Sequence, residues 1–232
     1  MSLLTLVQRC SARLSLIQPT ACFGSTDLQV LQWIEIANTA GEMLASAAPW
    51  QALRTEFTFS SMYQTSQTGA IPSDFDRWID NTQFNRSTRR PMAGPITPRQ
   101  WQWIQAQPIY ASVYLAWIER GGQFLVAPKP PAGQTIAFEY ISKNWVQAVG
   151  GGYAAAFAAD SDVSRLDERL LRLGMLWRYL QAKGLDYAEA MDDYERELEK
   201  AIARDGGASM MNVAPQPMDP RRANLPDGSF GA

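Results

Sequence analysis

Amphipathic helical segments at both ends of the chain constrain its fold most, because each has an apolar stripe that needs a partner. The first segment has apolar residues at alternating spacings of four and three, and Pro19 prevents it from continuing. Its stripe consists of Leu3, Val7, Cys10, Leu14 and Ile17. A second segment follows a capping residue, which is Ser25, Thr26 or Asp27, and continues with the same spacings to Pro49. The sequence therefore predicts two helices before residue 50.

Two more helices are predicted near the C-terminal end. Ser164 and Asp167 have the spacing of a helix start, and Gly184 is typical of a helix end. Asp186 and Glu189 repeat the starting pattern for the last helix. Its side chains expected to face solvent are Glu195, Glu197, Glu199 and Lys200. Packing all four helices together buries every apolar stripe, which predicts one helical bundle.

The middle of the chain changes to a strand pattern. Residues 56–59 alternate with period two, and the polar stretch through Gly69 favours a hairpin. Residues 117–126 predict a second hairpin around Gly121 and Gly122, and residues 135–142 predict a further strand. Between them, a capping box that begins at Thr97 predicts a short helix.

These segments predict an α+β protein. The helical bundle would comprise residues 1–51 and 149–207, and the inserted antiparallel β-rich region with its short helix would comprise residues 52–148. The glycine run at residues 150–152 lacks the spacing of a phosphate-binding loop, so we interpret it as a junction between the two regions. An extended arm would follow at residues 208–232.

Residues 208–232 abandon every earlier packing pattern. They contain four prolines and too few apolar groups to build a core. The scattered apolar side chains include Met210, Met211, Val213, Leu225 and Phe230. Such a segment is either dispensable disorder or an arm that binds a partner. The arm interpretation gains weight because the rest of the chain contains no recognisable catalytic motif.

Composition excludes several classes of function. The 232 residues contain no histidine, which removes the commonest general base and metal ligand, and the net charge of −2 gives no indication of nucleic acid or an acidic membrane. Cys10 and Cys22 form neither a zinc site nor a disulfide framework, and we expect Cys10, on the apolar face of its helix, to be a reduced core residue. No segment predicts a secretion signal or a membrane span. We expect no catalytic, metal or cofactor site.

Three groups of residues still need an interpretation. The cluster of Asp74, Asp76 and Asp80 lacks the glycine and distal glutamate of a calcium loop, so a solvated turn and a helix start near residue 73 explain it better. Glu119 and Glu139 are the best pair of carboxylates for glycosidase chemistry.

The third group is Arg86, Arg89 and Arg90, which could bind a protein partner or, with nearby aromatic residues, nucleic acid. The aromatic residues are Trp78, Phe84, Trp101 and Trp103.

With these elements in place, the chain resembles the head-to-tail adaptor family of short-tailed bacteriophages, also called tail accessory factors. The resemblance covers about residues 1–207 and rests on segments in all three parts of that range. They read STDLQVLQWIEIANTAGEML, STRRPMAGPITPRQW, FEYISKNWV and GLDYAEAMDDYERELEKAIARDGG. None of these segments is catalytic.

The resemblance implies a structural protein of the virion at the head–tail junction, assembled from the host cytoplasm. It implies a ring of about twelve copies under the portal protein, in which every copy exposes two different surfaces so that the ring closes. It also implies that the C-terminal arm binds portal subunits, that a further tail protein attaches, and that DNA passes without sequence-specific binding. Because at least one relative is associated with cell-wall cleavage, a peptidoglycan hydrolase of the phage tail is the alternative.

Overall fold

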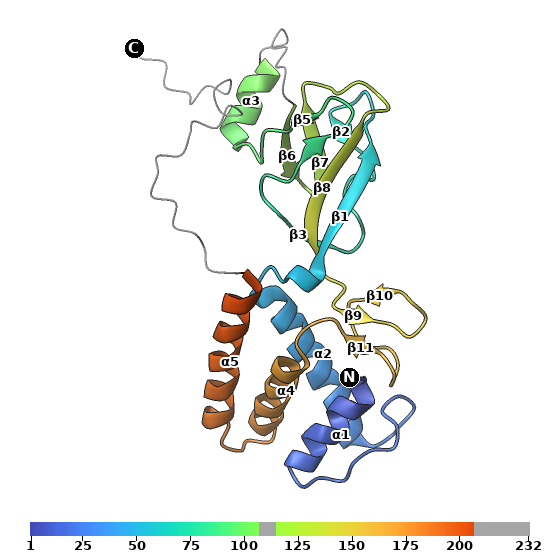
Figure 1. The fold of residues 1–232 in the computed structure, drawn as a ribbon, viewed down its shortest axis with the longest axis vertical. Coiled ribbons are helices and arrows are strands. Elements are labelled where there is room, and N and C mark those ends of the chain that lie inside the picture. The colour runs from blue at the N-terminus through green and yellow to red at the C-terminus, as the bar shows by residue number, and fades with distance from the viewer. Residues whose placement is uncertain (107–114, 207–232) are drawn as a thin grey trace. The chain divides into compact units, whose positions relative to one another are not determined.

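The computed structural model describes residues 1–106 and 115–206, and their fold is α+β (Figure 1). The described chain divides into two compact units. A helical unit comprises residues 1–54 and 142–206, and a sheet unit comprises residues 55–106 and 115–141. The predicted combination of a helical bundle and an inserted antiparallel β-rich region is confirmed, whereas the predicted arm at residues 208–232 lies outside the described residues.

The helical unit is built around α4 (Glu168–Ala182). This helix packs against α1 (Leu3–Arg13), α2 (Leu28–Ala47) and α5 (Ala188–Gly206), and α1 also packs against α2. The side chains of Trp33 on α2 and Tyr179 on α4 stack with ring centroids 4.2 Å apart. The core of the bundle therefore lies between α2 and α4, and α1 and α5 cover it.

The starts of the long helices follow their capping residues. Asp27 accepts a hydrogen bond from the amide of Gln29, and Asp167 accepts hydrogen bonds from the amides of Arg169 and Leu170. Such caps satisfy amide groups that have no partner inside the helix. Gly184 ends the α4 turn with a φ of 67°, as predicted from its position.

Two helix boundaries differ from the sequence-based expectation. Helix α1 ends at Arg13, and Ile17, expected on its buried stripe, is 89% exposed. Ser164 belongs to strand β11 (Val163–Ser164) and not to the cap of α4, although its hydroxyl accepts a hydrogen bond from the amide of Leu166. Local spacing alone does not show where tertiary packing ends a helix.

The sheet unit contains two antiparallel sheets. The larger sheet has the order β1-β8-β4-β5, with β3 also paired to β8, and the smaller has the order β2-β7-β6. The strands of the larger sheet are β1 (Arg54–Ser60), β3 (Phe75–Trp78), β4 (Phe84–Asn85), β5 (Arg90–Pro91) and β8 (Thr135–Ser142). Those of the smaller sheet are β2 (Ser66–Gln67), β6 (Ala116–Arg120) and β7 (Gln123–Ala127).

The β6–β7 hairpin is buried on both faces. One face contributes Trp117 and Phe124 to an aromatic core that includes Phe138 of the larger sheet. The other face packs against α3 (Pro98–Ala106), mainly through Trp101 and Ile104. Successive strand residues point to opposite faces, so one hairpin supplies both clusters.

Several predictions for this unit are confirmed. The β6–β7 hairpin pairs Trp117 with Val126 and turns at two glycines with positive φ. Helix α3 begins at the predicted capping box, in which the amide of Thr97 donates to the side-chain oxygen of Gln100 and the amide of Gln100 donates to the Thr97 hydroxyl.

The hairpin predicted for residues 55–69 is wrong, because β1 pairs with β8 and β2 pairs with β7. Likewise, the helix start expected near residue 73 is a strand, β3. Alternation identifies a strand but not its partner.

The glycine run also has a different place from the one expected. Residues 150–152 form the turn between β9 (Val146–Gln147) and β10 (Tyr153–Ala154), which with β11 make a small sheet inside the helical unit. Gly151 has a φ of 87°, a conformation that favours glycine. The run is therefore a hairpin turn and not a junction between the two units.

Candidate interaction surfaces

The arginine-rich segment forms the exposed turn between β4 and β5. The amide of Arg86 donates to the carbonyl of Thr135 at 2.8 Å, and the amide of Thr135 donates to the Ser87 hydroxyl at 2.9 Å. Asn85, which is buried, donates from its side chain to that of Gln134. These contacts hold the turn against the start of β8, so its arginines project from a fixed backbone.

The three arginines of this turn are exposed but differ in their surroundings. Arg86 forms an ion pair with Glu56 on β1, with 2.6 Å between Nη2 and Oε2. Arg89 has a φ of 55°, which places it in the left-handed region. Arg90 is the first residue of β5. Because Arg86 already has a carboxylate partner, Arg89 is the arginine best placed to contact another molecule.

The aromatic residues considered for a stacking surface lie elsewhere. The Trp78 ring is 4.9 Å from Trp117 and 4.8 Å from Phe138, inside the aromatic core. Trp101 of α3 is buried against the β6–β7 hairpin, and Trp103 packs against the same cluster. Phe84 alone among the four residues is exposed beside the arginines. The geometry thus supports a contact surface for a protein better than a platform for bases.

The candidate carboxylates are not assembled into a reacting pair. Glu119 on β6 accepts a hydrogen bond from the indole of Trp78, whereas Glu139 lies on β8 in the other sheet. Asp74 accepts a hydrogen bond from the Tyr140 hydroxyl, and Asp76 pairs with Arg77. No group of acidic, histidine or cysteine side chains that could hold a metal ion occurs in residues 1–106 and 115–206.

Both cysteines are buried free thiols. Burial raises the pKa of Cys10 to about 12, against opposing effects of Arg172 and Arg13. Burial, together with the nearby charge of Asp160, raises the pKa of Cys22 to about 11. A thiol is reactive as its thiolate, so neither residue is suited to nucleophilic chemistry near neutral pH. The expectation that Cys10 is a reduced core residue agrees with this environment.

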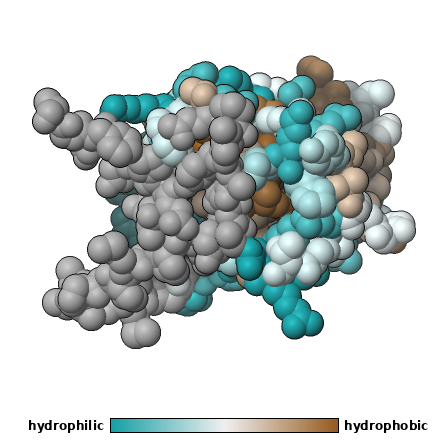
Figure 2. Space-filling model, turned by 90° about the horizontal axis from the view of Figure 1, so that it is seen from above, coloured by the Kyte–Doolittle hydropathy of each residue, from teal (hydrophilic) through white to brown (hydrophobic). Residues whose placement is uncertain are grey.

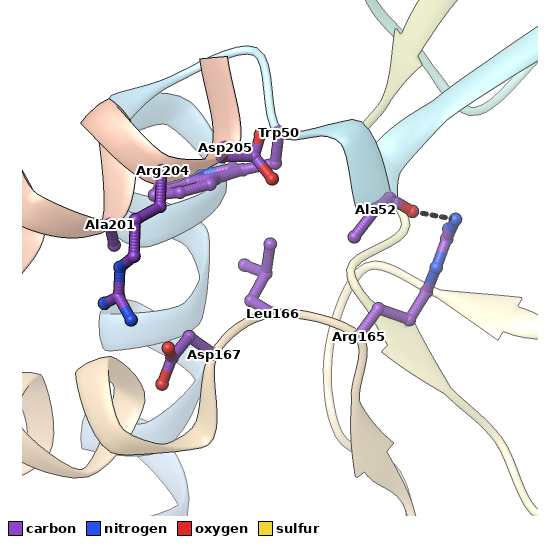
Figure 3. Close-up of a pocket in the computed structure, with 8 residues that line it drawn as sticks. All are labelled: Trp50, Ala52, Arg165, Leu166, Asp167, Ala201, Arg204 and Asp205. Atoms are coloured by element: carbon purple, nitrogen blue, oxygen red, sulfur yellow. Dashed lines mark hydrogen bonds between the residues drawn. The ribbon is translucent and has the colours of Figure 1, made fainter. Parts of the chain in front are cut away.

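A pocket of about 330 Å³ lies in the helical unit, where the end of α5 faces the start of α4 (Figure 3). Its lining residues are Trp50, Ala52, Arg165, Leu166, Asp167, Ala201, Arg204 and Asp205. The sequence did not predict this site, because the residues come from three separate segments without a common motif.

The polar groups of the pocket are committed to the backbone around it. Arg165 donates to the carbonyls of Asn144 and Ala52. Asp205 accepts a hydrogen bond from the amide of Gln51 at 2.8 Å. Asp167 caps α4. The pocket therefore joins the end of α5 to neighbouring segments, and the contacts of its charged groups are those of a structural site.

The apolar residues proposed for the C-terminal arm lie outside the described residues. They are Met210, Met211, Val213, Leu225 and Phe230. Elsewhere, the view in Figure 2 shows hydrophobic residues at the surface among hydrophilic ones, so this face is not uniformly polar. None of the described helices combines the length and apolar character that crossing a membrane requires.

Comparison with known proteins identifies the family. No curated protein matches the chain. The family model of the SU10 adaptor protein matches residues 1–221, which include both described units and part of the segment beyond them. This match agrees with the resemblance to phage adaptors and implies a structural, non-enzymatic role. The chain belongs to the SU10 adaptor protein family and is a structural component of a phage particle.

Proposed function

We propose that the chain is a head-to-tail adaptor that forms a ring of about twelve copies beneath the portal protein and links it to the next tail protein. The observation that carries this proposal is the family match, because it extends through both folded units and on to residue 221. Copies would fold in the host cytoplasm and join the virion at the head–tail junction, where DNA passes through the ring without being read.

The two units supply different contact surfaces for such a role. The sheet unit holds the exposed turn with Arg86, Arg89 and Arg90 on a backbone fixed by hydrogen bonds. Arginine is enriched at protein interfaces because its planar group binds carboxylates and packs on apolar surface. We assign this turn to a partner protein of the particle.

Residues 208–232 are assigned to the portal. Their five apolar side chains named above are too sparse for a core but are suited to small pockets on a partner. An arm that becomes ordered on binding loses conformational entropy, so one copy binds weakly. Many arms on one ring bind strongly together, because each bound arm raises the effective concentration of the others.

The first experiment mixes purified protein with the portal of the same phage and measures the mass of the complex. We expect the full chain to add a ring and a chain without residues 208–232 to fail. A matched pair of variants isolates the apolar contacts: Met210→Ser with Phe230→Ser should weaken binding, and Gln216→Ser with Asn224→Ser should not. Equal assembly by the truncated chain contradicts the assignment of the arm.

The arginine turn has its own test. Arg89→Asn removes the charge but keeps a residue that tolerates a positive φ, so the turn should retain its conformation. Arg54→Gln removes an exposed arginine outside the turn and serves as the control. Weaker binding of portal or tail protein is expected for Arg89→Asn alone, and equal binding by both variants contradicts a role for the turn.

No observation in the described residues favours the hydrolase alternative, since Glu119 and Glu139 lie in separate sheets. That alternative predicts clearing of a cell-wall suspension by the purified protein and loss of clearing in Glu119→Gln or Glu139→Gln. Clearing that both variants abolish would replace the structural proposal with an enzymatic one.

A further inference from the structure

Helix α5 carries an acidic stripe on its exposed side. The helix has seven acidic and three basic side chains, a net charge of −4. Two of its three basic side chains already form ion pairs: Arg196 pairs with Asp193, and Lys200 pairs with Glu197 at 3.0 Å. Three exposed carboxylates, on Asp192, Glu195 and Glu199, form no ion pair within the described part of the chain. We call these three residues the acidic stripe.

The acidic stripe is unfavourable for the isolated chain. Its members are spaced by three and four residues, so their like charges lie on one face of the helix and repel one another. They line a shallow groove together with Arg196, whose charge is already paired. A basic partner would relieve this repulsion.

A basic face lies at the other side of the helical unit. Helix α1 has no acidic residue and exposes Arg9 and Arg13, which are four residues apart on one side of the helix. Arg172 of α4 lies next to this helix, because the Cys10 thiol, between Arg9 and Arg13 in the sequence of α1, donates to the Arg172 carbonyl at 4.0 Å. None of the three forms an ion pair with another described residue. We call them the basic face.

Apolar residues beside the basic face are also exposed. Ile17 follows α1, and Leu28 and Leu31 begin α2, with exposed fractions of 89%, 81% and 45%. Exposed apolar groups bordered by charge are typical of protein interaction sites. The basic face therefore has both the charge and the apolar area of a contact surface.

The acidic stripe and the basic face belong to helices on opposite flanks of the same unit. Helix α1 packs on α2 and α4, whereas α5 packs on α4, and Figure 1 shows α1 and α5 at the two sides of the bundle. One copy cannot bring its own two surfaces together without unfolding the bundle. Two copies can, and repetition of that contact produces a chain or a closed ring.

We propose that the acidic stripe of α5 docks against the basic face of the next copy and forms the repeating contact of the ring. This inference rests on the proposed function, since it assumes that copies assemble. The charges give the contact its direction and register, and the apolar residues near α1 supply buried area. The chain's own C-terminal segment is a poor alternative occupant, because in residues 207–232 two arginines are balanced by two aspartates.

Charge reversal tests the pairing. Variant A is Glu195→Lys with Glu199→Lys, and variant B is Arg9→Glu with Arg13→Glu. Each replaces two like charges four residues apart with two of the opposite sign, so repulsion between the two changed positions is retained. Glu42→Lys with Asp80→Lys, two exposed acids that belong neither to the acidic stripe nor to the basic face and lie well away in sequence from Leu28 and Leu31, is the control matched in charge to variant A. Circular dichroism and thermal unfolding verify that all variants fold.

The readout is the mass of the complex with the portal and, in parallel, binding of single copies at high dilution. We expect variants A and B alone to need at least about tenfold higher concentration for ring formation than the unaltered chain. An equal mixture of A and B should restore the ring, because each altered surface then meets its complement in alternating copies. One chain carrying all four substitutions should also assemble, and the control should behave like the unaltered chain.

Two results overturn the inference. One is normal ring formation by A or B alone. The other is failure of the A and B mixture to assemble, which would mean that the stripe contacts the portal or the tail protein. If the unaltered chain forms no ring with the portal, the proposed function itself fails, and this outcome is distinguishable because it does not depend on the variants.

Discussion

Gly41 of α2 is a position where a very small substitution should have a large effect on stability. A methyl group at Gly41 would lie 2.0, 2.2 and 2.5 Å from three carbons of the Trp145 ring. Carbon atoms prefer separations of about 3.5–4.0 Å, so the ring would have to move by about 1.5 Å. Trp145 is 1% exposed and meets Phe157 edge to face at 4.9 Å, which leaves it no free space.

The magnitude follows from two opposing effects of Gly41→Ala. Alanine in place of glycine stabilises a helix interior by about 1 kcal/mol. Overpacking of a core costs about 1–3 kcal/mol and more when backbone must shift, and this contact is closer than side chains tolerate. Because the overlap at Gly41 reaches 2.0 Å, we take an overpacking cost of about 3–4 kcal/mol, which leaves a net loss of about 2–3 kcal/mol and lowers the melting temperature by roughly 5–10 °C for a chain of this size.

Guanidinium unfolding followed by helical circular dichroism measures this loss. Gly206→Ala, at the end of α5 with open space around the new methyl group, is the control and should be neutral or slightly stabilising. The double variant Gly41→Ala with Trp145→Leu should lose at least about 1.5 kcal/mol less than the sum of the two single variants. Additive losses, or a stabilised Gly41→Ala, would refute the steric reasoning.

Three further predictions concern the helical unit. Asp167→Ala should lower the free energy of unfolding by about 1 kcal/mol, because it leaves two amides at the start of α4 without their cap. Asp167→Asn should lower it by less, and equal losses for the two variants in thermal unfolding would contradict this. Arg178 is buried against the Trp177 ring at 4.2 Å without a carboxylate partner among the described residues, and burial lowers its pKa. Arg178→Met should therefore match or exceed the stability of the unaltered chain, whereas Arg178→Ala should lose about 2 kcal/mol of packing in the same assay. A loss of that size for Arg178→Met would show that the charge itself is needed. The pKa of Cys10 is about 12 in the folded chain, above its ordinary value of 9.0. The contribution of Cys10 to the free energy of unfolding is therefore complete below pH 9 and declines as pH rises toward 12, by up to about 1.4 kcal/mol per pH unit. Cys10→Ala should flatten this decline in stability with pH, and an unchanged slope would contradict the assignment.

Local chemistry made much of this fold predictable. Asp27, Thr97 and Gly184 mark helix boundaries through contacts within a few residues, and the paired glycines at residues 121–122 specify a tight turn between two strands. Each of these signals acts over one turn of backbone. A short stretch of sequence therefore contains the whole physical reason for the element.

Contacts between distant segments were not predictable in the same way. The alternation at residues 56–59 identifies a strand, yet its neighbour β8 begins at Thr135, and nothing in either segment specifies the other. The pocket near Trp50 is equally nonlocal, since Arg165 reaches it from the bend after β11 and Asp205 from the end of α5. Such sites depend on packing in three dimensions and leave no short motif.

The surfaces available for assembly show the same division. Sequence alone places Glu195, Glu197 and Glu199 on the solvent side of α5 and treats them alike. The structure separates them, because Glu197 forms ion pairs with Lys200 and Arg169, while the other two form none in the described part of the chain. A charge that already forms an ion pair contributes little to binding a partner, since binding must first break the existing pair. Unpaired charges of opposite sign on opposite flanks of one unit are therefore the residues with most to gain from the proposed contact between copies.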